Sequence, residues 1–410
     1  MIAPNMRFPE YMEGYINDSL SEIADRVRRK NSENQTDIPL TIASIEGLVD
    51  QRTYFGKTVA SKDMSGYYLL QNGEFAYNKS YSKGYPVGSI KRLDKYEQGA
   101  LSTLYICFAL KEDADVTSDY LVQYFNSPAW YEAVNEVCAE GARNHGLLNV
   151  SPDDFFATTH HFAPTKAEQE KVATFLSLYD QKIETQIAKV DALETRRKGL
   201  LQQIFSQEIR FKADGGSEFP KWEETKLNTY LYENKERNKD NKFGKEDVLS
   251  VSKDFGVINQ IQYQGRSLAG EDVSNYHIVR NGNVVYTKSP LGKQPYGIIK
   301  ASHEEGIVST LYAVYYCRDN ALPEIIDYYF SLDDTLNRYL KPLVNIGAKH
   351  DMKVNNTDAL AGIVTLPSSL EEQRKIVDFL QLVDKQIQVE KDKLEAIKLV
   401  KKGLLQQMFV

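Results

Sequence analysis

Two long stretches of the chain carry apolar residues at alternating steps of four and three. In the first stretch, residues 168–205, these positions are Val172, Leu176, Tyr179, Ile183, Val190, Leu193, Leu200 and Ile204. In the second stretch, residues 372–409, they are Ile376, Leu380, Val383, Ile387, Leu394, Ile397, Leu404 and Met408. Polar residues interrupt the register at Gln186, Arg197, Glu390 and Lys401. This heptad pattern predicts two long helices, each with a coiled-coil seam.

Each predicted helix needs a partner. A helix over residues 168–205 would be about 57 Å long, and an apolar stripe of that length is not stable in water. The nearest candidate is the other copy, so we expect the two helices to pack antiparallel; packing of each helix on its own domain alone is the alternative. The expected seam residues are Leu176, Ile183, Val190, Leu200, Leu380, Ile387, Leu394 and Leu404.

Proline and glycine residues bracket the predicted helices. Pro164 and Pro367 lie just before their starts, and Gly199 and Gly403 lie near their ends. A glycine inside a helix costs about 1 kcal/mol relative to alanine. Its presence at the matching position of both copies therefore predicts a close contact or a helix end there.

The two stretches are copies of one sequence. They align without gaps, and 17 of the 38 aligned positions are identical. The likeness continues upstream in four further pairs of segments, which are 8–9 with 219–220, 67–80 with 276–289, 99–105 with 306–312, and 141–143 with 347–349. The chain is therefore a pseudo-two-fold internal repeat, in which a globular part is followed by a long helix.

The globular parts have the patterns of mixed, strand-rich domains. Their signals are strands at 104–110 and 311–316, turns at Asn72-Gly73 and Asn281-Gly282, and helices at 120–137 and 324–340. We therefore predict an α+β fold with two mixed domains separated by two long antiparallel coiled-coil helices. The expected segments are residues 1–165 for the first domain, 166–212 for the first helix, 213–367 for the second domain and 368–410 for the second helix.

Composition limits the classes of protein to consider. The 410 residues suffice for two domains, and no apolar run approaches the roughly 20 residues of a membrane span. The N-terminus lacks the pattern of a signal peptide, so we expect a cytoplasmic protein. Cys107, Cys138 and Cys317 are far apart, which predicts three buried thiols. With a net charge of −7, any contact with nucleic acid must rest on locally concentrated Lys and Arg.

The order of these segments and the motifs at their borders resemble the specificity subunits of type I restriction-modification systems. The shared motifs are Phe-Pro near each domain start, EQ(R/E)K where each helix opens and KGLLQQ(I/M)F where it closes. The resemblance covers essentially the whole chain. The first domain departs from the family at Tyr15, where many relatives carry the tryptophan that the second domain keeps as Trp222. That difference affects local packing only.

The resemblance implies a division of labour. Each globular part would be a target-recognition domain that reads one half of a bipartite DNA site, and the helices would set the spacing between the halves. The family's partners are double-stranded DNA, two modification subunits that methylate a flipped adenine, and motor-nuclease restriction subunits. S-adenosylmethionine, ATP and Mg²⁺ are expected on those partners, so this chain would be a non-catalytic subunit without a cofactor of its own.

The sequence shows no motif of a catalytic site. Methyltransferase and nucleotide-binding motifs are missing, and Asn126-Ser127-Pro128-Ala129-Trp130 lacks the second proline of the methyltransferase tetrad. His160-His161 has no further ligand at metal-binding spacing, and adjacent side chains on a strand point in opposite directions. We therefore expect no metal site there.

Two loops in each globular part have the residues that DNA contact requires. Base edges are read by Arg, Lys, Asn and Gln, whereas phosphates are bound by Lys, Ser, Tyr and backbone N–H groups. The first loop offers Lys79, Ser80, Tyr81, Lys83 and Tyr85, and its counterpart offers Lys288, Ser289, Lys293 and Gln294. The second offers Arg143, Asn144 and His145, and its counterpart offers Lys349 and His350. For any one of them the alternative is a solvated turn.

Two other classes stay open at this point. The chain could serve a fused methyltransferase-nuclease system as its specificity subunit, which sequence patterns separate poorly from a type I system. It could also be a scaffold without DNA, whose coiled coil presents two binding domains. A stand-alone methyltransferase is disfavoured because its motifs are missing.

Overall fold

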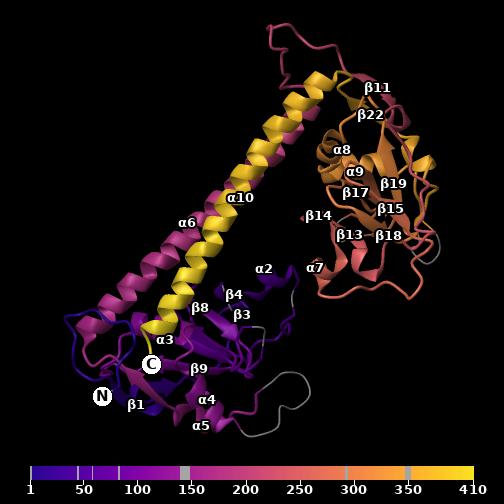
Figure 1. Cartoon of the computed structure of the whole chain (residues 1–410). Helices are drawn as coiled ribbons and strands as arrows, with labels where there is room; N and C mark the ends of the chain where they lie inside the picture. Colours follow the sequence, from indigo (N-terminus) through magenta and orange to yellow (C-terminus); the bar gives the residue numbers. More distant parts are fainter. Residues whose placement is uncertain are drawn as a thin grey trace. The chain divides into compact units, whose positions relative to one another are not determined.

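The structure, a computed structural model, divides the chain into two compact units (Figure 1). It describes residues 2–43, 46–57, 59–81, 84–138, 148–290, 294–346 and 352–410. Unit 1 comprises Met1–Ala188 with Asp392–Val410, and unit 2 comprises Lys189–Lys391. Because both divisions fall inside the long helices, each unit holds one globular part and a portion of each helix.

Unit 1 begins with its globular part and leads into the first long helix. Its strands are β1 (Ile16–Ser19), β2 (Ala24–Arg26), β3 (Leu40–Ala43), β4 (Gly47–Asp50), β5 (Tyr68–Gln71), β6 (Phe75–Asn78), β7 (Ser89–Arg92), β8 (Gln98–Leu101), β9 (Ile106–Leu110) and β10 (Thr159–Phe162). Its helices are α1 (Leu20–Ile23), α2 (Gln51–Phe55), α3 (Ser118–Asn126), α4 (Tyr131–Val137), α5 (Pro152–Phe156) and the start of α6 (Lys166–Phe205).

Unit 2 repeats this order. Its strands are β11 (Glu223–Lys226), β12 (Leu231–Glu233), β13 (Leu249–Ser252), β14 (Gly256–Asn259), β15 (His277–Val279), β16 (Val284–Thr287), β17 (Ile298–Ala301), β18 (Gly306–Val308), β19 (Tyr312–Cys317), β20 (Asn345–Ile346), β21 (Met352–Lys353) and β22 (Ile363–Leu366). Its helices are α7 (Gln260–Gln264), α8 (Pro323–Phe330), α9 (Asp333–Leu340) and the start of α10 (Leu370–Gln407), with short 3-10 turns η1 (Leu227–Thr229), η2 (Lys245–Asp247) and η3 (Asp358–Leu360).

A four-stranded antiparallel sheet lies at the centre of each globular part. The strand order is β2-β9-β6-β7 in unit 1 and β12-β19-β16-β17 in unit 2. The predicted strands correspond to β9 and β19, and the predicted turns hold Gly73 and Gly282 at φ of +85° and +86°. The α+β prediction is therefore confirmed, with one sheet topology used twice. Among the described residues, no helix has the length and apolar run of a membrane span.

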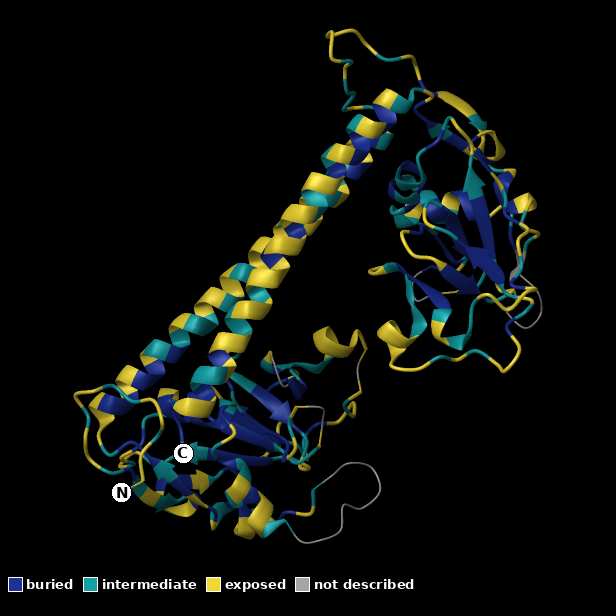
Figure 2. Ribbon diagram, viewed as in Figure 1, coloured by how far each residue is buried: buried dark blue, intermediate teal, exposed yellow. Residues whose placement is uncertain are grey.

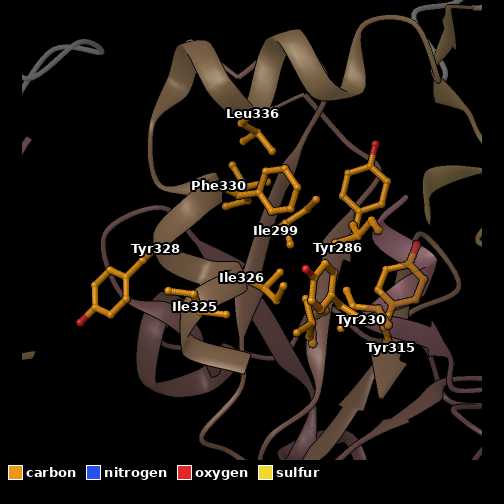
Figure 3. Packing of buried hydrophobic residues seen from close by; sticks show 14 of the residues in the cluster. Tyr230, Tyr286, Ile299, Tyr315, Ile325, Ile326, Tyr328, Phe330 and Leu336 are labelled. Atoms are coloured by element: carbon orange, nitrogen blue, oxygen red, sulfur yellow. The ribbon is translucent and has the colours of Figure 1, made fainter. Parts of the chain in front are cut away.

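One helix covers the central sheet and forms a core with it. In unit 2, Ile325, Ile326 and Phe330 of α8 are buried in one cluster with Tyr286 of β16 and Tyr315 of β19 (Figure 3). Full burial of a large apolar side chain stabilises a fold by about 1.5–3 kcal/mol. The strands that pass through this cluster are buried on most positions, whereas the connecting loops are exposed (Figure 2).

The two long helices pair antiparallel, as predicted (Figure 1). In unit 2, Lys189 of α6 pairs with Glu390 of α10 at 3.0 Å, and Arg197 pairs with Asp384, so residue numbers rise along one helix as they fall along the other. Figure 2 shows buried residues recurring along both helices between exposed ones. The expected seam residues divide into the buried Leu176, Val190, Leu380 and Ile387 and the half-buried Ile183, Leu200, Leu394 and Leu404.

Each helix also packs on a globular part, so the alternative arrangement holds in part. The core of unit 1 contains Val172 and Leu176 at the start of α6 together with Leu405 at the end of α10. The core of unit 2 contains the start of α10 and, from the end of α6, Leu201 and Ile204. Both globular cores are therefore completed by two helices.

Two of the polar interruptions tie the helices to the globular parts. Lys401 pairs with Asp180, whose second carboxylate oxygen accepts a hydrogen bond from the Gln123 amide of α3 at 3.0 Å. At the equivalent place in unit 2, Asp384 pairs with Arg197 and accepts the Tyr328 hydroxyl of α8 at 2.9 Å. Each aspartate therefore joins a cation of the other long helix to a helix of its globular part.

The Glu-Gln pair that opens each long helix is fully buried and satisfied. Glu168 binds the Arg7 guanidinium through both oxygens, at 2.6 and 2.7 Å, and Glu372 binds Arg210 at 2.9 Å. The next residue of each helix, Gln169 or Gln373, donates to two backbone carbonyls and accepts from the backbone N–H just before α3 or α8. This explains why the repeat keeps the Glu-Gln motif: it joins the helix to its domain.

Three expectations require correction. The helices predicted at 120–137 and 324–340 are each broken in two. The first ends before Pro128, which has no backbone N–H to continue it, and the second ends where the Ser331 hydroxyl bonds back to the Asp327 carbonyl. Gly199 and Gly403 mark neither a close contact nor a helix end. Both lie inside continuous helix, where an added Cβ would meet nothing within 4 Å.

The prediction of three buried thiols is right for Cys107 and wrong for the other two. Cys138 and Cys317 are only half-buried, because each lies at or just beyond the end of its element. All three cysteines are free. Burial raises the pKa of Cys107 and of Cys317 to about 12, which leaves both thiols protonated at neutral pH.

We predict that Gly199→Ala and Gly403→Ala each stabilise the protein, because helical alanine is favoured and the added methyl group meets no neighbour. Each change should raise the free energy of unfolding by about 1 kcal/mol, measured by denaturant titration. The control is Gly297→Ala, where φ is +85° and the Cβ would lie 1.8 Å from the Thr287 carbonyl oxygen. That variant should be destabilised, and a loss of stability in the helical variants would contradict the open environment.

Candidate nucleic-acid interface

The first predicted loop of each half leaves the same edge of the central sheet. It follows β6 in unit 1 and β16 in unit 2, and it returns through a glycine with positive φ, Gly88 or Gly297. A Cβ on either glycine would lie within 2.0 Å of a carbonyl oxygen at the strand end, on Asn78 or Thr287. Only glycine closes the loop this tightly, so both units hold the loop in the same way.

In unit 1, Lys79 of the first loop contacts the described segment that starts at residue 148. The Lys79 carbonyl accepts the Leu148 N–H at 2.9 Å, and the Lys79 ammonium donates to the Val150 carbonyl at 3.2 Å. In unit 2 the Lys288 ammonium donates to the Asn356 side chain at 3.1 Å. Asn356 follows β20 and β21, which pair on either side of residues 347–351. Each lysine therefore connects the first loop to the segment that comes after the second.

The other described candidates differ in how accessible they are. Tyr81 is 61% exposed, and the half-buried Ser80 donates its backbone N–H to Asn78. Tyr85 is half-buried, and burial raises the pKa of its hydroxyl. Ser289 is half-buried, whereas Gln294 is 2% exposed and donates to Asp333 of α9 at 2.6 Å. Tyr81 is therefore the side chain most open to a ligand among these.

Half of the proposed contacts cannot be placed. Lys83, Arg143, Asn144, His145, Lys293, Lys349 and His350 lie outside the described residues. Their assignment to DNA contact stays a prediction from the sequence.

A third loop, which the sequence patterns did not single out, leaves the same edge of each sheet. It follows β2 in unit 1, where Asn31 is fully buried and bonds both the carbonyl and the N–H of Thr36. It follows β12 in unit 2, where Asn238 bonds Phe243 in the same two ways. The loops are rich in cations, which are Arg28, Arg29 and Lys30 in unit 1 and Lys235, Arg237, Lys239 and Lys242 in unit 2.

A short repeated motif could have revealed this loop. Residues 30–34 read KNSEN and residues 237–241 read RNKDN, so a cation, a clamping Asn, an acid and a second Asn recur at the same spacing. The second Asn adopts the left-handed conformation in both, with φ of +51° at Asn34 and +48° at Asn241. Asparagine is among the few residues that tolerate this conformation, which gives the motif a structural cause.

His160 and His161 have structural surroundings. His160 is buried between the Tyr124 and Thr158 hydroxyls, at 3.0 and 2.8 Å, and burial lowers its pKa to about 4. Its neighbour His161 points the other way and contacts Asn17. Within the described part of the chain no group of three or more His, Cys, Asp or Glu could hold a metal ion. Trp130 is fully buried and donates to the Phe125 carbonyl.

Comparison of the folds identifies the class of protein that shares this arrangement. The structure superposes over 100% of its length on 99% of the type I restriction-modification S subunit from M. genitalium, with a TM-score of 0.53 and 12% identity. It also superposes over 97% of both chains, with a TM-score of 0.56 and 15% identity, on a chain from a study of complex assembly and conformational transition of the type I R-M system. The duplicated domains and paired helices are thus the fold of type I S subunits.

Sequence comparison points to the same class. The chain is 24% identical over 254 residues to the type I restriction enzyme MjaVIII specificity subunit of Methanocaldococcus jannaschii. The alignment spans 59% of this chain and 59% of that relative. No protein-family model matches the chain. The resemblance drawn from the repeated motifs is confirmed by this relative and by the shared fold.

We predict that Arg143→Ala and Lys349→Ala each weaken binding to specific DNA, because each would remove a cation that the sequence assigns to DNA contact at matching positions of the repeat. Loss of one good base contact costs about 1–3 kcal/mol, or roughly 5- to 150-fold in affinity. The measurement is a mobility-shift titration at fixed salt, with the exposed Lys95 mutated to Ala as the control. Unchanged affinity would remove the mutated residue from the set of DNA contacts.

Proposed function

We propose that this chain is the DNA-specificity subunit of a type I restriction-modification system, in which each globular part reads one half of a bipartite site. The observation that carries the proposal is the repetition of one recognition scaffold with different loops. Both central sheets send two loops from the same ends of equivalent strands, after β2 and β6 or after β12 and β16, and much of the loop sequence differs between the halves, while the long helices keep 17 of 38 aligned positions. Two such readers on one chain fit a site with two unlike halves.

The methylation and restriction reactions are assigned to partner subunits. Two modification subunits would bind S-adenosylmethionine and methylate the target adenine, and restriction subunits would use ATP and Mg²⁺. This chain would contribute recognition alone, acting in the cytoplasm where the DNA lies. Partners would also supply phosphate contacts beyond those of this chain, whose net charge is −7.

Methylation mapping by single-molecule sequencing tests this function. Cells with the gene should carry a split adenine-methylation motif that cells without the gene lack. A scaffold without DNA would leave the methylation pattern unchanged, and that result would overturn the proposal. Recovery of a single, continuous motif would argue against two half-site readers.

The paired helices are proposed to set the distance between the half-sites. We predict that a seven-residue insertion between Gln186 and Val190, matched by one between Glu390 and Leu394, keeps the heptad register and lengthens the pair by about 10 Å. The methylated half-sites should then keep their sequences and move apart by up to about three base pairs.

The control is an insertion of equal length between Gly215 and Gly216, in the exposed turn that the Ala213–Ser217 hydrogen bond closes. It lengthens the chain without lengthening the helices. A half-site gap that stays the same in the helical variant, or that changes equally in the control, would refute the role of the helices in spacing.

A further inference from the structure

In unit 1, two cations follow the C-terminal ends of two strands of the central sheet, β2 and β6. Strands β2 and β6 lie on either side of β9 and run in the same direction, because each is antiparallel to it. Arg26 of β2 and Phe75 of β6 both pair with Phe108. Four residues beyond this shared level lie Lys30 and Lys79. Lys79 directly follows β6, whereas the chain after β2 has turned to β5, where Lys30 is the bridge partner of Tyr68.

Unit 2 repeats the arrangement at the same register. Glu233 of β12 and Val284 of β16 both pair with Tyr315 of β19. Four residues beyond that level lie Arg237 and Lys288. The cations are therefore equivalent in the two halves, although the surrounding loop sequences differ.

None of these four cations forms an ion pair with a carboxylate of the described residues. Each donates instead to an uncharged oxygen: Lys30 to the Gly66 carbonyl at 2.9 Å, Lys79 to the Val150 carbonyl at 3.2 Å, Arg237 to the Asn275 carbonyl at 2.9 Å, and Lys288 to the Asn356 side chain at 3.1 Å. Nearby cations behave differently, since Arg29 pairs with Glu74 and Arg280 pairs with Glu236.

An aromatic or imidazole ring lies beside the first cation of each pair. Lys30 and Tyr68 are bridge partners, and the ammonium lies 4.1 Å from the ring centroid. Arg237 is the bridge partner of His277, which is 1% exposed and whose Nδ1 has no hydrogen-bond partner among the residues that the structure describes. Burial, with smaller contributions from the charges of Arg237 and Lys288, lowers the pKa of His277 to about 4. The buried nitrogen is therefore an unfilled polar position next to two cations.

The two cations of unit 2 also act on each other. Burial lowers the pKa of the Lys288 ammonium, and the nearby charge of Arg237 lowers it further. Glu233 opposes this shift in part, but its carboxylate accepts a hydrogen bond from the Asn356 amide at 2.8 Å. Like charges held together without a counter-ion favour the binding of an anion between them.

We propose that Lys30 with Lys79 and Arg237 with Lys288 bind backbone phosphates of the DNA duplex, one pair for each half-site. The inference rests on the proposed function and assigns phosphate contacts and base contacts to different residues. The paired cations position the duplex without regard to sequence, and exposed loop residues such as Tyr81 are left to contact bases. Phosphate oxygens would supply the negative charge that the uncharged acceptors of these four cations do not provide.

The test is the salt dependence of binding to a mixed-sequence DNA duplex, measured on the full chain with its modification subunits. Each phosphate contact contributes about 0.9 to the slope of log K against log salt. The double variants Lys30→Gln/Lys79→Gln and Arg237→Gln/Lys288→Gln should therefore each lower the slope by about 1.8. The conservative variant Arg237→Lys/Lys288→Arg should keep it. Should a double variant not fold, Lys30→Gln alone, at an exposed position, should lower the slope by about 0.9.

The matched control is Arg52→Gln/Lys245→Gln, which removes the same charge from cations already paired with Asp50 and Glu271. Its slope should stay close to that of the unmodified complex. An equal fall in the control, or an unchanged slope in the test variants, would overturn the phosphate assignment and leave the proposed function standing. Failure of the unmodified complex to bind any duplex at low salt would overturn the proposed function itself.

Discussion

Pairing of α6 with α10 is the interaction on which the rest of the structure depends. Each helix presents an apolar stripe that water does not tolerate, and each is too long for one small domain to cover. Antiparallel pairing buries both stripes along each other and carries the end of each helix into a globular core. Phe409, just after α10, packs on Tyr120 and Tyr124 of unit 1, with ring centroids 5.3 and 5.8 Å away. Neither core is complete without both helices.

The polar groups on these helices specify how they are joined. A coiled-coil seam of apolar residues alone is compatible with more than one register, and a buried polar residue at the seam reduces that freedom. Asp180 and Asp384 hold an opposing cation and a hydrogen-bond donor from the globular part at once. The Glu-Gln pairs at the starts of α6 and α10 likewise bind a cation, Arg7 or Arg210, and a backbone N–H of the globular part. Repetition of these ties in both units preserves the scaffold while the loops vary freely.

The sequence was informative where one residue pattern has one structural outcome. The heptads predicted both long helices to within two residues of their observed starts, and the aligned repeat predicted one fold used twice. The break after Ser127 could have been predicted from Pro128, which lacks a backbone N–H, whereas the break at Ser331 was missed because serine is tolerated inside helices. The sequence also did not show that Gly199 has space around it, because the residue type alone does not tell which neighbours a helix position contacts. The pairing of the cations was missed for a similar reason. Lys30 and Lys79 are 49 positions apart in the sequence, and their strands are related only through β9, which pairs with both.

The acidic composition of the chain and a role on DNA are compatible once charges are placed on the fold. Most of its acidic side chains are either solvated or used within the fold, as Glu168 and Glu372 are in binding Arg7 and Arg210. An ion pair of this kind exerts little electrostatic attraction on a ligand, because its two opposite charges largely cancel. What attracts a polyanion is a cation without an acid beside it, however negative the whole chain is. The sheet edges supply such cations at equivalent positions in both halves, so net charge alone is a poor guide to nucleic-acid binding in a protein of this architecture.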